Sequence, residues 1–403
     1  MAGHVFGAGN AELVYPPASH LFTMLPVEGW YPILQDLGVT GYVFPYVYPP
    51  LWAALAAPLT LTADFATFQA VAVVLNPVLL TGCVVAAWRL AGSGWDLGTF
   101  LIVGLVVLLT SSVGSVALNQ NQPQILVAFL TIWAIERTEK GFPATGGLLL
   151  ALAAAIKIYP VLYVVFWLAS RQYRAAFAFL LAGTCLAGLS VYLCGWPLHA
   201  QFLELLGSIS RTAMLTNYSY IWESVVGALL YPDGMQAVIP HPVNPGDSAL
   251  VGWRILGKPR SLTIVFQIAQ LVALACFAAA FRHSSDAHTR ALLWASAFAT
   301  LSLLGPMSWS YHYISVVAFA PCILQGYGWR KGGLMLAGFI LLTTPHVRLI
   351  VSADSCPTPE LSRLLQSMGT LAVSLLAFAL FRLRKTNVAG HASTRSHQDS
   401  PQP

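Results

Sequence analysis

Long apolar stretches alternate with short polar breaks along almost the whole chain. An apolar run of about 20 residues can cross the hydrocarbon core of a bilayer as a straight helix. Several of the runs are shorter than this, which predicts tilted or broken spans. The expected helices cover residues 66–88, 97–113, 121–136, 143–156, 159–170, 175–193, 261–282, 289–304, 310–327, 332–346 and 367–382. We therefore expect an all-α polytopic membrane protein with about 11 transmembrane helices.

The composition agrees with this pattern. Hydrophobic residues make up 57% of the 403 residues and charged residues only 9%, and the mean hydropathy is +0.69. These values exclude an ordinary soluble domain. The net charge of +5 does not indicate a nucleic-acid partner, because the basic residues lie between the helices and in the tail. The lipid bilayer is the predicted partner of this surface.

The basic residues also predict an orientation, since lysine and arginine gather in cytoplasmic loops. No lysine or arginine occurs from Met1 to Trp88, so residues 1–65 are expected outside the cytoplasm. The breaks expected on the cytoplasmic side carry Arg89, Arg137, Lys140, Arg171, Arg174, Arg282, Arg290, Arg330, Lys331, Arg382, Arg384 and Lys385.

This orientation predicts one membrane-embedded domain over residues 1–385, in the plasma membrane, with a second extracytoplasmic segment at 194–260. Residues 386–403 are polar and rich in Ser, His and Gln, a composition typical of a disordered tail. We expect this tail in the cytoplasm.

Polar clusters interrupt the apolar pattern at several places that all fall on the predicted outer face. Polar side chains so close to hydrocarbon are costly, and they usually line a cavity or a site. A common face is what one active cavity built from distant loops requires. A transporter, the alternative, more often holds its polar groups near the midplane of the membrane. The clusters are the N-terminal stretch, 119–122, 157–160, 194–260 and 306–313.

The cluster Pro306–Tyr313 carries the most chemistry. Its proline ends the preceding helix, and Ser308 is placed to cap the next one. Trp309 and Tyr311 suit an aromatic belt at the membrane interface. The imidazole of His312 can act near neutral pH as a base, an acid or a hydrogen-bond donor to phosphate.

This cluster resembles the Pro-x-Ser-Trp-x-His-His signature of the family 87 glycosyltransferases, membrane mannosyltransferases of the GT-C class. Pro306, Ser308, Trp309 and His312 match, and Tyr311 stands in the place of the first histidine. The resemblance implies a GT-C-like fold. It also implies transfer of a hexose, typically mannose, from a polyprenyl-phosphate sugar to an extracytoplasmic glycan or glycolipid acceptor.

Lys157-Ile158-Tyr159-Pro160 closely resembles the Lys-x-x-Pro stretch of the same family. A lysine between two apolar runs costs a few kcal/mol at membrane depth unless it reaches the interface or meets an anion. The donor phosphate is such an anion. The resemblance therefore predicts that Lys157 contacts the phosphate and that Tyr159 lies in the substrate site.

Three further stretches resemble family elements. Tyr46–Ala53 is similar to a Tyr-x-Tyr-Pro-Pro-Leu stretch, which places Tyr48 in the substrate site. Asn121 and Gln122 begin a stretch similar to Gly-Gln-x-Asn, and their amides can bind sugar hydroxyls, although a polar helix cap explains them equally well. Asn217 begins a stretch similar to the family's Asn-x-Ser element, which also reads as a glycosylation sequon.

The catalytic base is the weakest part of the resemblance. GT-C enzymes generally use an acidic residue in the first outer loop, after a first helix, and here Ala11 occupies the place of that aspartate. Glu12 is the predicted base, with Glu28 and Asp36 as alternatives. A catalytically inactive relative is therefore a further reading, and a family member would be expected to have one more N-terminal span.

The implied reaction is an inverting sugar transfer. An acceptor hydroxyl attacks the anomeric carbon, and Lys157, Arg211 and His312 are expected to hold the leaving phosphate electrostatically. A lipid donor needs no nucleotide clamp, no Asp-x-Asp motif occurs, and the six cysteines show no ligand spacing. We expect no metal and no cofactor besides the lipid-linked donor.

Overall fold

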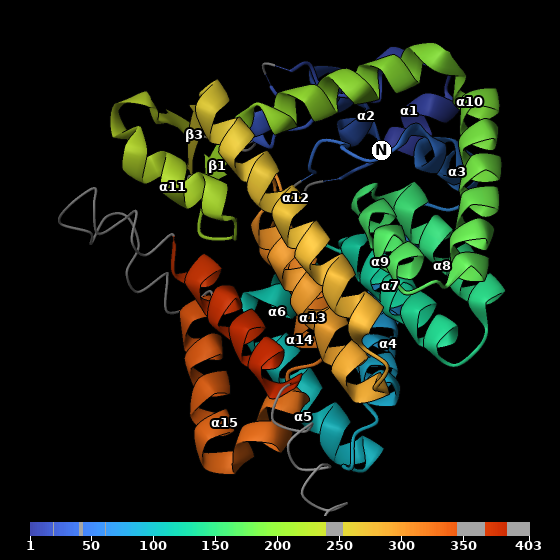
Figure 1. Cartoon of the computed structure of the whole chain (residues 1–403). Coiled ribbons are helices and arrows are strands. Elements are labelled where there is room, and N and C mark those ends of the chain that lie inside the picture. Colours follow the sequence, from blue (N-terminus) through green and yellow to red (C-terminus); the bar gives the residue numbers. More distant parts are fainter. Residues whose placement is uncertain (19, 40–42, 61, 239–252, 345–366, 385–403) are drawn as a thin grey trace, which may run out of the picture.

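The computed structural model describes the chain except for residues 19, 40–42, 61, 239–252, 345–366 and 385–403. Most of the described residues form helices that stand side by side, and a layer of shorter elements covers one end of them (Figure 1). We call this layer the outer layer. The predicted tail lies outside the described residues.

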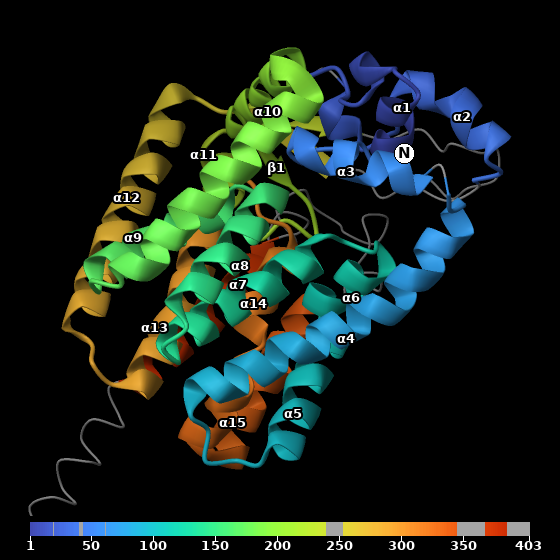
Figure 2. The ribbon, with the colours of Figure 1, turned by 90° about the vertical axis from the view of Figure 1, so that its right-hand side faces the viewer.

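Four described helices are long and apolar enough to cross a membrane. They are α4 (Phe65–Ala91), α10 (Tyr173–Ser210), α12 (Arg260–His283) and the helix Ser367–Arg384. A fifth span arises if α5 (Leu97–Thr110) and α6 (Ser112–Asn119), which are bent by 70°, count as one. The chain is therefore a helical membrane protein, whereas the expected number of 11 spans is not confirmed. Figure 2 shows α4 slanting from the outer layer toward the opposite end of the bundle.

Most of the other helices of the bundle follow the predicted bounds closely. The predicted helix 310–327 is wrong, because residues 314–317 and 321–327 belong to different helices, and the second of these bends at Gly328 and continues into the residues predicted as 332–346. Tyr163 and Phe166 pack against Trp294 of α13, together with Phe281 and Phe298. All five rings are buried, so this aromatic cluster forms the centre of the core. The helices are α7 (Gln124–Glu139), α8 (Pro143–Ile156), η4 (Tyr159–Tyr163), α9 (Val164–Ala169), α13 (Ala287–Leu303), α14 (Ile314–Val317) and α15 (Pro321–Thr343).

The N-terminal stretch forms half of the outer layer. The sequence predicted no helix before Tyr46, yet this stretch holds several short ones. The first packs closely on α3, because a Cβ added at Gly3 would lie 2.8 Å from the Cβ of Ala56. The elements are α1 (Ala2–Gly7), η1 (Ala11–Leu13), η2 (Leu21–Thr23), η3 (Glu28–Trp30), α2 (Tyr31–Asp36) and α3 (Pro50–Thr60).

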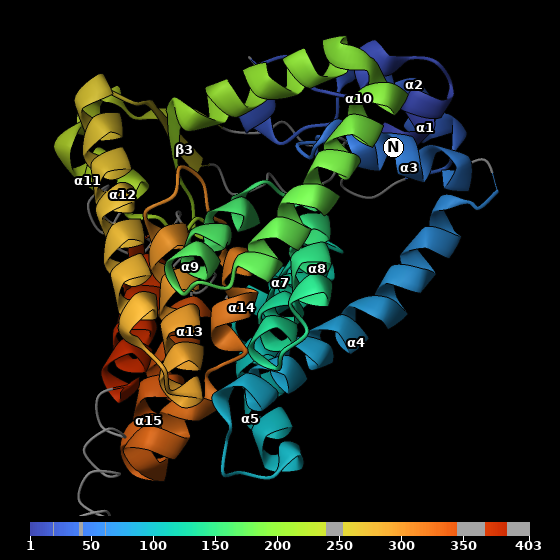
Figure 3. The ribbon, with the colours of Figure 1, turned by 45° about the vertical axis from the view of Figure 1, so that its right-hand side comes forward.

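The second half of the outer layer begins where α10 bends. Gly195 has φ 70° and ψ 161°, a conformation that glycine adopts without steric cost. Beyond this bend, α10 runs across the end of the bundle (Figure 3). It leads into an antiparallel sheet of order β1-β3-β2. The elements are β1 (Thr212–Leu215), α11 (Trp222–Leu230), η5 (Pro232–Gly234), β2 (Gln236–Val238) and β3 (Trp253–Gly257).

Candidate active site

Lys157 and His312 meet beneath the outer layer. The Lys157 Nζ atom lies 3.2 Å from the His312 Nε2 atom. Lys157 follows the last residue of α8 in an extended conformation, with φ −140° and ψ 132°. His312 lies in the short 3-10 helix η6 (Ser310–Tyr313). Each residue thus sits in a break between helices, and the structure brings together two residues that sequence reasoning had assigned to one site.

A backbone hydrogen bond defines the proton position on the His312 ring. The backbone N–H of Trp309 donates to Nδ1 of His312 over 2.8 Å. The contact between Nδ1 and the carbonyl oxygen of Trp309 is longer, at 3.3 Å. Since Nδ1 accepts a hydrogen bond, the neutral ring carries its proton on Nε2, the atom that faces Lys157.

Burial disfavours the protonated, positively charged forms of Lys157 and His312 when no ligand is bound. It lowers the pKa of Lys157 to about 7. Burial and the neighbouring Lys157 lower the pKa of His312 well below its usual value. Two hydrogen-bond donors face one another here, and a shared anionic acceptor would stabilise both. This arrangement is compatible with the predicted binding of a phosphate, which stays a prediction.

Aromatic rings surround the ammonium group. Its nitrogen lies 5.4 Å from the centroid of the Tyr48 ring and 5.1 Å from that of Tyr311. Both distances are within the range of a cation–π interaction. Tyr159 meets the His312 ring edge-on, with 5.9 Å between the centroids. Tyr311, which departs from the family signature, thus contacts the lysine.

The amide cluster reaches the same place. The Tyr48 hydroxyl donates to Oε1 of Gln122 over 3.0 Å. The Asn121 side chain instead accepts from Asn76 of α4 over 3.2 Å. The alternative of a polar helix cap is wrong, because the N-cap of α7 is Pro123 and makes no side-chain hydrogen bond.

Gln124, which stands in the place of the asparagine in the Gly-Gln-x-Asn-like stretch, also contacts this cluster but is not among the predicted site residues. Its Nε2 donates to the Tyr159 hydroxyl over 2.7 Å. Its Oε1 is buried and has no hydrogen-bond partner among the described residues. Its position two residues after Gln122, in a polar stretch before an apolar helix, was the available signal.

The Asn-x-Ser stretch runs alongside the 306–313 cluster. The N–H of Tyr220 donates to the Ser308 carbonyl over 2.8 Å, and that of Ser310 to the Tyr218 carbonyl over 2.7 Å. This pairing places Ser219 opposite Trp309, and Asn217, two residues earlier in the chain, is half-buried. The expectation that Ser308 caps the next helix is wrong, because Trp309 is the N-cap of η6.

Glu12 and Arg211 lie in the outer layer, and both are exposed. Glu12 is in η1, three residues before Tyr15, whose hydroxyl donates to the Tyr48 carbonyl over 2.7 Å. Arg211 ends α10 beside the sheet. No hydrogen bond or ion pair joins either side chain to Lys157 or His312 in the described part of the chain. Their proposed roles stay predictions.

Two other expectations about the site concern acids and metals. Glu28 and Asp36, the alternative bases, are exposed in the same layer as Glu12. Within the described residues, no three His, Cys, Asp or Glu side chains are grouped so that they could hold a metal ion. The expectation of a reaction without metal stays a prediction.

These features define a helical membrane protein with a half-buried lysine–histidine site beneath an outer layer. The sequence model of glycosyltransferase family 87 matches residues 46–306. This is more than half of the chain, so the protein belongs to glycosyltransferase family 87. The match includes Tyr48 and Lys157 and ends at Pro306, and the fold adds His312 to the same site.

Similar proteins of known activity come from mycobacteria. A polyprenol-phosphate-mannose-dependent alpha-(1-2)-phosphatidylinositol pentamannoside mannosyltransferase of Mycobacterium tuberculosis is 21% identical over 356 residues, which are 87% of this chain and 72% of that protein. A phosphatidylinositol mannoside mannosyltransferase of the same species, with the same donor in its name, is 24% identical over 77% of this chain and 70% of its own length. A pentamannoside mannosyltransferase of Mycolicibacterium smegmatis is 23% identical over 77% of this chain and 69% of its own length.

Proposed function

We propose that the protein transfers a mannose residue from a polyprenyl-phosphate donor to a glycan or glycolipid acceptor on the extracytoplasmic side of the plasma membrane. The related mycobacterial enzymes are named for such a donor and for phosphatidylinositol mannoside acceptors. The observation that carries the proposal is the contact between Lys157 and His312. The lack of lysine and arginine from Met1 to Trp88 supports the sidedness.

The donor phosphate is the anion that the pair would hold. Lys157 would supply an ammonium group and His312 the Nε2–H, and the two nitrogen atoms lie 3.2 Å apart. As the bond between the anomeric carbon and the phosphate oxygen breaks, the phosphate leaves with the electron pair. Donors already in position stabilise this growing negative charge without reorganising.

The acceptor hydroxyl forms the new bond to the anomeric carbon and must lose its proton. His312 is poorly suited to take it, because Nε2 carries a proton and Nδ1 accepts from Trp309. Glu12 remains our candidate base, and its neighbour Tyr15 is bonded to the Tyr48 backbone at the edge of the site. A positioned base contributes about 10²–10⁴-fold to such a reaction.

The sugar-binding groups would be the amides and rings around the pair. Tyr48 donates a hydrogen bond to Gln122, and both side chains have further donor or acceptor groups that could bind sugar hydroxyls. Trp309, Ser308, Asn217 and Tyr159 would complete this wall, and Asn121 would fix its position against α4.

The decisive experiment uses purified protein, radiolabelled polyprenyl-phosphate-mannose and a phosphatidylinositol mannoside acceptor. We expect a mannosylated product from the wild-type chain. We expect His312→Ala to lower the turnover number by at least about 100-fold, the range found when a transition-state hydrogen-bond donor is removed. The matched control is His283→Ala, since His283 is exposed at the C-terminal end of α12.

Other outcomes decide against the proposal. Wild-type turnover by the His312→Ala protein would remove the pair from the mechanism. Movement of the labelled lipid across proteoliposomes without product would indicate a transporter. Neither product nor movement, with all substrates present, would indicate an inactive relative.

A further inference from the structure

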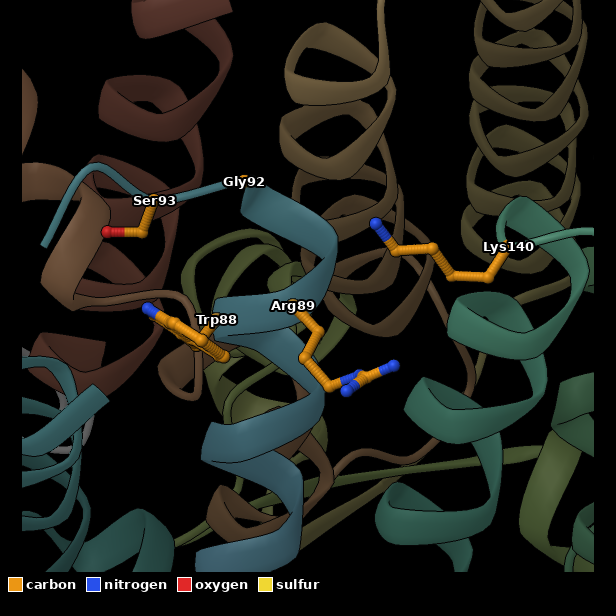
Figure 4. Close-up of a pocket in the computed structure, with 5 residues that line it drawn as sticks. All are labelled: Trp88, Arg89, Gly92, Ser93 and Lys140. Atoms are coloured by element: carbon orange, nitrogen blue, oxygen red, sulfur yellow. The ribbon is translucent and has the colours of Figure 1, made fainter. Parts of the chain in front are cut away.

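A second basic site lies at the other end of the α7–α8 hairpin, away from Lys157. Figure 4 shows a pocket between the C-terminal ends of α4 and α7. Its volume is about 250 Å³ and it is lined by Trp88, Arg89, Gly92, Ser93 and Lys140. Arg89 reaches toward the Lys140 side of the pocket in this view. None of these residues takes part in the sugar transfer derived above.

The charges around the pocket do not balance. Glu136 binds two guanidinium groups, those of Arg89 at 2.6 Å and Arg137 at 2.5 Å. Glu139 is bound by Arg290 at 2.6 Å. The Lys140 ammonium group has neither a hydrogen bond nor an ion pair among the described residues, although the Lys140 backbone N–H donates to the Glu136 carbonyl over 3.0 Å. Two carboxylates thus face four basic groups, an excess of two positive charges.

Other local charges offset this excess. α4 and α7 both end at the pocket, and each helix C-terminus carries roughly half a negative charge. Asp286 lies on the turn that reaches Ala91 through His288, and it caps its own helix by accepting from the Thr289 N–H over 2.7 Å. Among the residues that line the pocket, Arg89 is paired with Glu136, whereas the Lys140 ammonium group has no side-chain partner in the described part of the chain, so Lys140 is the group available to a monoanion.

The size of the pocket restricts that ligand. Its volume of about 250 Å³ lies below the roughly 300–1,000 Å³ of pockets that enclose drug-sized molecules. It suits a phosphate group with a small substituent better than a sugar nucleotide.

Tryptophans at the same level indicate a membrane interface. The Trp88 indole N–H donates to the Trp95 carbonyl over 2.9 Å. The Trp95 ring stacks on Trp329, with 5.4 Å between the centroids. Trp329 is 67% exposed, and exposed tryptophans of membrane proteins concentrate at the level of lipid headgroups. A phosphate bound in this pocket is therefore at the depth of a lipid phosphate.

We propose that this pocket binds the phosphodiester headgroup of an anionic membrane lipid, held by Lys140 and Arg89. The Nε atom of Arg89 donates a hydrogen bond to Glu136, so the two terminal nitrogens of Arg89 would bind the ligand. The site is separate from the transfer reaction and does not depend on the proposed function.

The test uses the full chain purified in detergent. The wild-type protein is titrated with short-chain phosphatidylglycerol, with short-chain phosphatidylcholine and with inorganic phosphate, and the rise of the unfolding temperature reports binding. We expect phosphatidylglycerol to bind more tightly than the other two. Lys140→Gln should weaken its binding about fivefold, the factor for one basic side chain near a lipid surface, and Lys140→Glu should weaken it further. The control Arg174→Gln changes an exposed basic residue outside the pocket and should bind as the wild type does.

Three results would overturn the proposal. Unchanged phosphatidylglycerol binding in both Lys140 variants would show that the pocket is not the site. Equal binding of inorganic phosphate and phosphatidylglycerol would indicate a site for a free anion. Equal binding of phosphatidylcholine would indicate general lipid contact.

Discussion

At the scale of single residues, the main finding is that Lys157 is held among rings and a second donor, without a carboxylate partner in the described part of the chain. Lys157 is half-buried, and a lysine shielded from water usually has an anion beside it or gives up its proton. Here the cation–π contacts with Tyr48 and Tyr311 offset part of the cost of burial. A ligand that supplies a negative charge would bind tightly, because folding has already removed Lys157 from water and binding does not repeat that free-energy cost.

The low pKa of Lys157 predicts a pH dependence of donor binding. In our proposal the protonated form binds the phosphate, and burial lowers the pKa of Lys157 without a ligand to about 7, so above that pH the lysine would have to take up a proton on binding. The KM for the donor should rise by up to about tenfold per pH unit there. In Lys157→Arg the guanidinium stays charged, and the rise should disappear even if the KM is higher throughout. Initial rates measured from about pH 6 to about pH 9 test this, and an equal slope in both proteins would contradict it.

At the scale of elements, the site is made by interruptions of helices. Sequence reasoning located these interruptions because lysine, proline and histidine are conspicuous in apolar surroundings, as at Lys157 and Pro306. It did not find the 70° bend between α5 and α6. The bend lies at Ser111, which is extended with ψ 157°, and a serine flanked by Thr110 and Ser112 gives no clear signal of a break. Nor did it predict the sheet, whose short strands depend on partners distant in the sequence.

The helix Ser367–Arg384 packs against the segment that positions part of the active-site cluster. A Cβ added at Gly369 would collide with the ring of Tyr220. Tyr220 is fully buried, and its backbone is bonded to Ser308 beside the active-site cluster. The glycine therefore allows this helix to press against the loop that positions Trp309.

We expect Gly369→Ala to destabilise the protein by about 1–3 kcal/mol, as overpacking of a core does. The turnover number should fall as well, because displacement of Tyr220 moves the paired 306–313 cluster. Gly338→Ala is the matched control, since no heavy atom lies within 4 Å of an added Cβ there. Thermal unfolding and transfer assays of both variants test this, and equal behaviour of the two would exclude the support role.

At the scale of the whole molecule, the two ends of the bundle differ in charge. The outer layer contains the stretch without lysine or arginine, whereas Arg89, Arg137 and Arg290 gather at the opposite end. Sequence reasoning predicted this separation from loop charges alone. The number of spans was harder to predict, because apolar helices such as α8, with 14 residues, are buried by neighbours and need not cross the bilayer alone.

The orientation can be tested with single cysteines in a chain whose six native cysteines are replaced by alanine. Glu28 and Gly94 are both exposed, one in the outer layer and one in the loop after α4. A membrane-impermeant maleimide should label Glu28→Cys in intact cells and Gly94→Cys only after permeabilisation. The reverse labelling would place the lysine–histidine site on the cytoplasmic side.

The N-terminal part of α4 is exposed, and this exposure has a consequence for the kinetics of the enzyme. Val71 is 57% and Val74 is 70% exposed. Asn76, two residues after Val74, donates a hydrogen bond to Asn121 of the predicted site. We expect this exposed apolar face of α4 to contact lipid, so that a donor with a polyprenyl tail would approach the site within the plane of the membrane. Its supply is then set by its mole fraction among the lipids and not by its amount per volume of solution. Added inert phospholipid would slow the enzyme by surface dilution, although every reactant remained present in the same quantity.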